Sequence, residues 1–127
     1  PEAFLDAGHA LRYVVEPAAA GLGARLGVLL LQFSPLPAAL LREPHRVIER
    51  LHAFLEQMPR GVQFAIEWRD AAMLGADYES MLEATGAVHG YSAHPRMPRL
   101  AQQLSRPGRG PCVGRWLLER GQLYEEA

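Results

Sequence analysis

The sequence predicts an α/β fold of the TIM-barrel type, with about half a barrel present as four parallel strands that alternate with helices. Three observations support this prediction. Short apolar runs of strand length alternate with longer segments of helical spacing, which indicates βαβ units and a parallel sheet. The first of these runs is apolar on both faces, as in sheets covered by helices. The second ends in charged residues, and ligands bind at that end of parallel strands.

The first half of the chain contains two predicted helices and one strand. We expect a helix from Phe4 to Arg25, divided at Pro17 because proline lacks the N–H that the helix needs and clashes with the preceding turn. Glycines then turn the chain into a strand over 28–33, which we expect to be fully buried. A long helix follows over 45–58, where one apolar stripe predicts packing against the sheet.

The second half continues the alternation. The expected elements are a strand over 62–69, a helix over 77–84 with Gly86 as its C-cap, a strand over 87–92, a helix near 99–104, a strand over 112–117 and the start of a helix over 123–127. No internal repeat or linker is present, so residues 1–127 are expected to form a single domain. Since a whole barrel takes roughly 250 residues, we expect that domain to be incomplete.

Charge and composition exclude several classes of function. The net charge of -1 gives no overall attraction to nucleic acid or to an anionic membrane. The segment 92–120, however, holds six arginines and His94 against the single acid Glu119, which suits a small anionic ligand but also an ordinary solvated surface. All basic residues are arginines, so lysine-based catalysis is excluded. The longest apolar run is too short to span a bilayer.

The single cysteine and the missing motifs exclude further classes. Cys112 allows no intramolecular disulfide and favours a reduced, cytoplasmic protein. Its apolar setting predicts a buried, unreactive thiol. No glycine-rich phosphate loop, nucleophile elbow or paired Cys-x-x-Cys is present. We therefore expect no cofactor.

Strand alternation places a group of polar residues together. Along 62–69, Glu67 and Arg69 share one face, while the bulky apolar residues share the other, which suits the layer between sheet and helices. The polar face must then point into the barrel. The same alternation turns Gln32 and Arg115 inward. These four side chains are predicted to converge at the top of the barrel.

Two interpretations of this cluster remain open. In the functional one, Glu67 is a general acid or base, Arg69 and Arg115 clamp a carboxylate or phosphate, and His94 is a second titrating group. In the structural one, Glu67 and an arginine form a buried pair that holds neighbouring strands together. The prolines around Arg96 stiffen the loop over 94–98 and suggest a binding surface.

A metal site is the weaker alternative. His89, His94 and Glu67 are residue types that bind zinc, but the strand alternation leaves the direction of His89 undetermined. No metal is therefore expected.

Four passages carry a family resemblance. LGVLLLQFSPLP (26–37), LHAFLEQMPRGVQFAIEWRD (51–70), GAVHGYSAHPRMPRLAQQ (86–103) and GRWLLERGQLYEEA (114–127) resemble consecutive blocks of the domain-of-unknown-function-72 family, also called YecE-like. The resemblance implies a TIM barrel and further strands before and after this region. The flanks of Arg69 depart from the family pattern, which more often has a smaller aliphatic residue or Phe at position 68 and Asn or His at position 70. The family implies a site position but no reaction.

The sequence thus favours an enzyme that acts by acid/base chemistry on a small anionic or polyhydroxy substrate at the carboxyl ends of the strands, either a hydrolase or an isomerase. The alternative is a non-catalytic barrel that binds a phosphorylated ligand or nucleic acid through its arginine-rich rim; the net charge argues against nucleic acid. The expected catalytic residues are Glu67 and His94, and the expected substrate-binding residues are Gln32, Arg69, Arg96 and Arg115.

Overall fold

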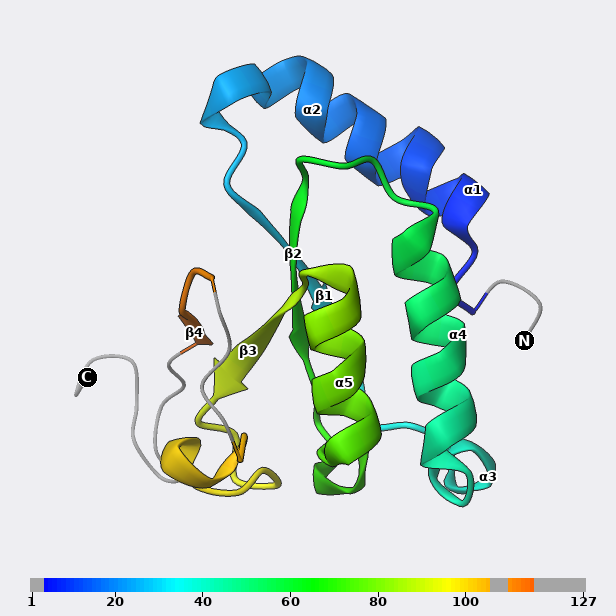
Figure 1. The fold of residues 1–127 in the computed structure, drawn as a ribbon, viewed down its shortest axis with the longest axis vertical. Helices are drawn as coiled ribbons and strands as arrows, with labels where there is room; N and C mark the ends of the chain where they lie inside the picture. The colour runs from blue at the N-terminus through cyan, green and yellow to red at the C-terminus, as the bar shows by residue number, and fades with distance from the viewer. Residues whose placement is uncertain (1–3, 106–109, 116–127) are drawn as a thin grey trace, which may run out of the picture.

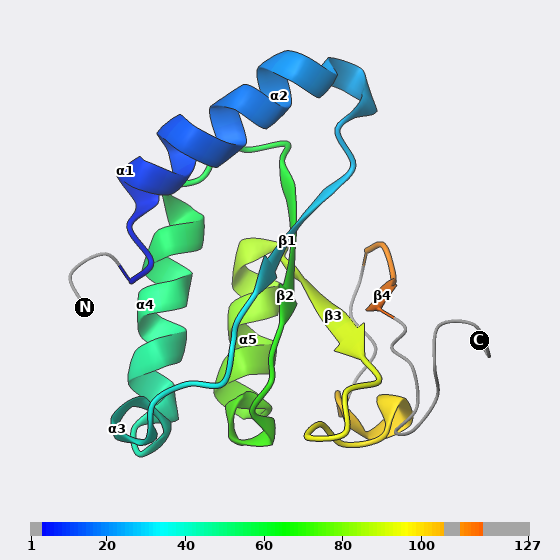
Figure 2. The same ribbon diagram turned by 180° about the vertical axis from the view of Figure 1, so that it is seen from behind.

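Four parallel strands form a curled sheet that corresponds to half of an α/β barrel (Figures 1 and 2). The computed structural model describes residues 4–105 and 110–115. The strands follow one another in chain order and are β1 (Val28–Gln32), β2 (Gln63–Glu67), β3 (Val88–Ser92) and β4 (Val113–Arg115). Each pairs in parallel with the next. The predicted fold class is therefore confirmed.

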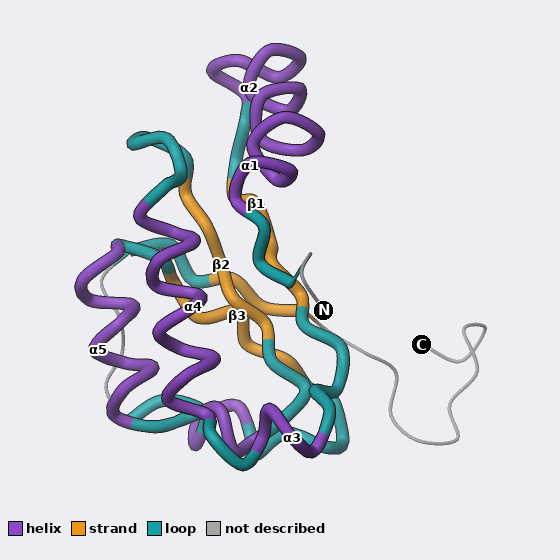
Figure 3. Tube along the Cα trace, turned by 90° about the vertical axis from the view of Figure 1, so that its right-hand side faces the viewer, coloured by secondary structure: helices purple, strands orange, loops and turns teal. Residues whose placement is uncertain are grey.

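Helices and helical turns precede β1 and connect the strands. They are α1 (Ala7–Ala10), a π-helical turn (Leu11–Val15), α2 (Glu16–Leu22), a 3-10 turn (Gly23–Arg25), α3 (Ala38–Leu41), α4 (Pro44–Glu56), a 3-10 turn (Ala71–Met73), α5 (Ala76–Thr85) and a 3-10 turn (Leu100–Gln102). Figure 3 shows α4 and α5 side by side on one face of the sheet. In the part of the chain that is described, no helix combines the length and apolar character needed to cross a bilayer.

The core lies between the outer face of the sheet and the helices α4 and α5. The apolar stripe of α4 is buried there, with Leu51 fully enclosed. From β2 and its C-terminal extension, Ile66 and Trp68 enter the same layer, as strand alternation predicts. Trp68 stacks on Phe33 with 4.4 Å between ring centroids. This packing fixes the opposite faces of β1 and β2 toward the barrel interior.

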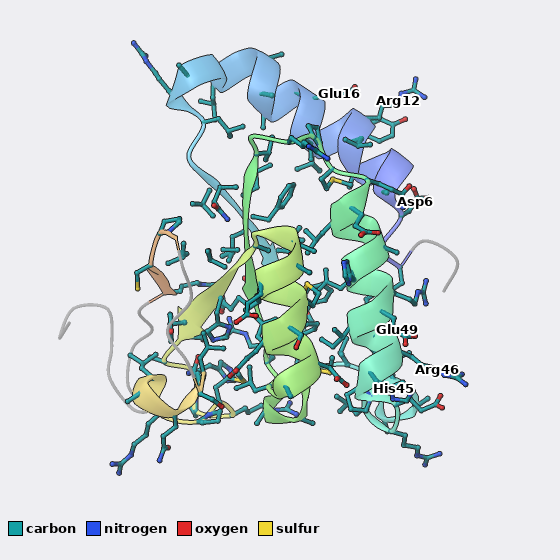
Figure 4. The ribbon with its side chains drawn as sticks, in the orientation of Figure 1. Asp6, Arg12, Glu16, His45, Arg46 and Glu49 are labelled. Atoms are coloured by element: carbon teal, nitrogen blue, oxygen red, sulfur yellow. The ribbon has the colours of Figure 1, made fainter. Side chains whose placement is uncertain are left out.

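The outer sides of the helices are charged. Figure 4 labels Asp6, Arg12 and Glu16 along the helical segment that precedes β1, and His45, Arg46 and Glu49 on α4; all six are exposed and point away from the sheet. Gly86 adopts the left-handed conformation with φ of 75° and caps α5 through its N–H to the carbonyl of Leu82. Its predicted role as C-cap is confirmed.

The first helix differs from the prediction at Pro17. The chain stays helical from Ala7 to Arg25 and is not divided there. Instead, the π-helical turn over 11–15 precedes Pro17, and the N–H of Glu16 donates to the carbonyl of Leu11. The wider turn changes the hydrogen-bond pattern just before the proline, which lies in the first turn of α2, where its missing N–H costs least.

Three further predictions are wrong in part. The strand over 28–33 is not fully buried: Leu30 is 39% exposed because it faces the barrel interior, where no described strand lies opposite. Cys112 is exposed, not buried, since it precedes the edge strand β4. The helix near 99–104 is only the 3-10 turn Leu100–Gln102. Residues 116–117 of the expected last strand and the helix start over 123–127 lie outside the described residues.

Candidate functional site

The carboxyl ends of the strands bring the predicted polar residues together. Glu67 ends β2 and lies in register with Gln32, which ends β1. Arg115 ends β4 and lies in register with Ser92, which ends β3. Arg69 follows β2 by two residues and so shares the inward face of Glu67. Gln32, Glu67, Arg69 and Arg115 thus form one cluster at the inner face of the sheet, which we call the mouth cluster.

Glu67 is the centre of the mouth cluster. It is 0% exposed. Nη2 of Arg69 lies 2.9 Å from its Oε1, and Nη1 of Arg115 lies 3.5 Å from its Oε2. Arg115 also donates from Nη1 to Oε1 of Gln32. One buried carboxylate is therefore held between two guanidinium groups from different strands, as a charge in such a place requires.

The two carboxylate oxygens of Glu67 have unfilled hydrogen-bond acceptor positions among the described residues. Both are buried, and neither accepts a well-aligned hydrogen bond from the described residues, despite the two ion pairs. Buried polar atoms without hydrogen bonds are rare in folded proteins, because each costs free energy. Each oxygen thus keeps an acceptor position that no described residue fills with a well-aligned hydrogen bond.

The two arginines of the cluster differ in accessibility. The side chain of Arg69 is buried, and its Nη1 donates to Oγ of Ser92 at 2.9 Å. The side chain of Arg115 is 41% exposed. Arg69 therefore orients the carboxylate from within, while Arg115 can turn part of its guanidinium toward solvent.

The loop after β3 lies beside the cluster. The backbone N–H of His94 donates to Oγ of Ser92 at 3.2 Å, and Nδ1 of His94 accepts from the backbone N–H of Arg96 at 3.2 Å. Partial burial lowers the pKa of His94, and the positive charges of Arg69 and Arg96 act in the same direction, whereas Glu67 opposes them. The imidazole is therefore neutral near pH 7 and able to exchange a proton.

Arg96 itself has a second anchor. Its side chain is 57% exposed, and Nη2 lies 3.6 Å from Oδ1 of Asp70. The other oxygen of Asp70 accepts from the backbone N–H of Leu36 at 2.8 Å. Asp70 thus links the loops that follow β1, β2 and β3. Sequence reasoning did not assign Asp70 to the site.

Two other residues of the site were missed. Ser92 accepts hydrogen bonds from Arg69 and from the loop; its place at the end of a strand, two residues beyond Gly90, was a usable signal. A Cβ at Gly90 would lie 3.2 Å from the carbonyl oxygen of Ile66 and 3.3 Å from Cβ of Glu67. Glycine in a strand often marks such a close approach, and here it leaves room for the carboxylate.

The residues considered for a metal do not come together. His89 lies on the outer face of β3, where its Nδ1 is 2.8 Å from the hydroxyl of Tyr78 on α5, while Glu67 faces the interior. Within residues 4–105 and 110–115, no three His, Cys, Asp or Glu side chains are placed to hold one ion.

The sequence comparison agrees with the resemblance noted above. The family model described as "Protein of unknown function DUF72" matches residues 3–118. The chain belongs to the DUF72 family. The match includes all four strands and every residue of the mouth cluster. No curated protein and no solved structure matches the chain. Membership of DUF72 carries no reaction, so the chemistry must be argued from the site.

Proposed function

We propose that this DUF72 protein is an enzyme that acts on a small anionic or polyhydroxy molecule at the carboxyl ends of its strands. Glu67 acts as general acid or base, and His94 is the second group that exchanges a proton. Arg115, Gln32 and Arg96 bind the substrate, and Arg69 holds the carboxylate of Glu67. The lone cysteine is in keeping with action in the cytoplasm.

One observation carries this proposal: the fully buried carboxylate of Glu67 has two oxygens without a well-aligned hydrogen bond among the described residues. A purely structural ion pair gains most when every lone pair is satisfied. A hydroxyl or N–H of a substrate would complete the set and would place a transferable proton against the carboxylate. This favours a ligand that carries hydroxyl groups.

The charge balance favours an anion. Arg69 and Arg115 share the single negative charge of Glu67, so these three groups leave one positive charge over. Arg96 faces its own acid, Asp70, and does not change this balance. Guanidinium groups bind carboxylates and phosphates through paired N–H donors. A hydroxy acid or a sugar phosphate has both the anionic group and the hydroxyls.

A binding function without chemistry is the alternative. Among the described residues, Arg96 and Arg115 are partly exposed cations at the mouth cluster, and both can hold a phosphorylated ligand whether or not Glu67 transfers a proton. The two functions differ only in what Glu67 does.

A thermal-shift series tests the binding part. We expect one member of a panel of sugar phosphates, hydroxy acids and nucleotides to raise the melting temperature of the protein, and Arg115→Gln to abolish the shift. Arg60→Gln is the matched control, because Arg60 is an exposed arginine at the amino-terminal end of β2. If no compound shifts the folded protein, or if both variants retain the shift, the mouth cluster does not bind an anion.

Glu67→Gln separates catalysis from binding. Glutamine keeps the size of the side chain but cannot take up a proton, so turnover of the bound compound should fall at least about 100-fold while binding persists. Glu56→Gln, on the exposed end of α4, should leave turnover unchanged. Binding that survives in a protein with no turnover of any bound compound would favour the alternative.

A further inference from the structure

A second polar network lies directly behind the mouth cluster, on the other face of β3. It consists of Tyr78 on α5, His89 on β3 and Gln103 after the last 3-10 turn, all buried. None of these side chains belongs to the proposed chemistry. The network ends at the main chain of Ser92, whose hydroxyl accepts a hydrogen bond from Arg69 of the mouth cluster.

The hydrogen bonds fix the orientation of the Gln103 amide. One terminal atom lies 2.7 Å from the carbonyl oxygen of Ser92 and 2.8 Å from that of Pro98. Only the NH2 group can face two carbonyl oxygens, so this atom is Nε2. The amide oxygen then accepts from the backbone N–H of Ser92 at 3.3 Å. Gln103 therefore binds both the N–H and the C=O of Ser92.

This orientation determines the tautomer of His89. Its Nε2 lies 3.0 Å from the amide oxygen of Gln103 and must therefore carry a hydrogen. Burial lowers the pKa of His89, so the ring is neutral and its Nδ1 is an acceptor. The hydroxyl of Tyr78, 2.8 Å away, must donate to it. Burial raises the pKa of Tyr78, which keeps that hydroxyl protonated.

We propose that Gln103 is a positioning residue for the mouth cluster: its amide ties the loop over 93–98 to the end of β3 and so sets Ser92, Arg69 and His94. Ser92 connects Gln103 to the mouth cluster. Its main chain is held by Gln103, while its Oγ accepts from Nη1 of Arg69 at 2.9 Å and from the backbone N–H of His94 at 3.2 Å. The inference deepens the proposed function and rests on it for its effect on ligand binding.

The first test reads the tautomer in the unaltered protein. Nitrogen-15 NMR of the histidine side chains should show His89 with a protonated Nε2 and a bare Nδ1, unchanged between pH 8 and pH 7. A protonated Nδ1 would mean that the amide of Gln103 is turned the other way and would overturn the inference.

The second test compares two neighbouring glutamines. Gln103→Leu should speed hydrogen exchange at the backbone N–H of His94 at least tenfold and should shift the guanidinium resonances of Arg69. Gln102→Leu, at an exposed position beside it, should change neither. Gln103→Glu serves if the leucine variant does not fold, because it keeps an acceptor toward His89 but loses the two donors to the carbonyls. Unchanged exchange and Arg69 signals in whichever variant folds would contradict the positioning role.

Binding of inorganic phosphate separates this inference from the proposed function. If the unaltered protein binds phosphate, Gln103→Leu, or Gln103→Glu in its place, should weaken the affinity at least tenfold, and equal affinity would refute the positioning role while leaving the proposed function intact. If the unaltered protein binds neither phosphate nor the panel compounds, the proposed function fails. The exchange and Arg69 measurements then decide the positioning role alone.

Discussion

The two faces of β3 and its neighbours hold two polar groups of opposite character. On the inner face, Glu67 lies between two guanidinium groups and has oxygens without well-aligned hydrogen bonds among the described residues. On the outer face, the neutral amide and imidazole of Gln103 and His89 each use both donor and acceptor positions. A satisfied neutral network holds backbone in place. A charged group with spare acceptors is suited to receive a ligand.

Removing the buried guanidinium should have the largest effect on the inner face. In Arg69→Met, the carboxylate of Glu67 keeps only the longer contact with Arg115, and Ser92 loses a donor. We expect the free energy of unfolding to fall by about 3–5 kcal/mol, measured by urea denaturation. Arg60→Met should change it by less than about 0.5 kcal/mol. A loss below about 1 kcal/mol would show that the pair is not buried as described.

Filling the space beside the carboxylate should have the next largest effect. In Gly90→Ala, the new methyl group would lie 3.2 Å from the carbonyl oxygen of Ile66 and from Cδ1 of Leu30. We expect a loss of about 1–3 kcal/mol in chemical denaturation. Gly21→Ala is the control, since nothing lies within 4 Å of its added Cβ and alanine favours helix α2. Equal stability of the two variants would contradict the close approach at Gly90.

The stability that the second polar network of Tyr78, His89 and Gln103 contributes should decrease in acid. The pKa of His89 is lower in the folded chain than its ordinary value near 6.5, so the unfolded chain binds a proton first as the pH falls. The contribution of His89 is fully present above pH 6.5 and declines as the pH drops through the folded-state pKa. Lowering the pKa by one corresponds to about 1.36 kcal/mol in the free energy of unfolding.

Thermal unfolding between pH 8 and pH 5 measures this effect. His89→Gln should be less stable at pH 8 but should lose less stability on acidification than the unaltered protein. His45→Gln, at an exposed position on α4, is the control substitution. Identical slopes for the unaltered protein and His89→Gln would show that His89 does not titrate as described.

The smallest effect on stability is expected at Arg115. Its ion pair is 3.5 Å long and its side chain is 41% exposed, so solvent screens most of its contribution. Arg115→Gln should change the free energy of unfolding by at most about 1 kcal/mol, measured by urea denaturation. The same variant should lose the response to anions. A large stability loss would place Arg115 with the structural residues.

The fold was more accessible to sequence reasoning than the details of the site. Alternation along the strand around Glu67 was sufficient to predict the core side of Trp68 and the convergence with Arg115, because parallel strands with helical crossovers leave few other arrangements. The role of Gln103 could not be predicted from the sequence, since four of its contacts join it to the main chain of Ser92 and Pro98 and to the side chain of His89, and no sequence pattern marks these. A short helix was predicted there, but the Gln103 side chain bonds the Pro98 carbonyl and the chain forms only a 3-10 turn.

A double substitution tests most directly whether the mouth cluster serves the proposed function or is only a structural ion pair. Glu67→Gln combined with Arg69→Met removes the buried pair without leaving a lone buried charge, so it should cost less stability than Arg69→Met alone. We expect the double variant to recover stability lost in Arg69→Met and to lose turnover of the bound compound, because Glu67 is the proposed acid or base. A double variant that remains as unstable as Arg69→Met and still turns the compound over would show that the pair is a structural element.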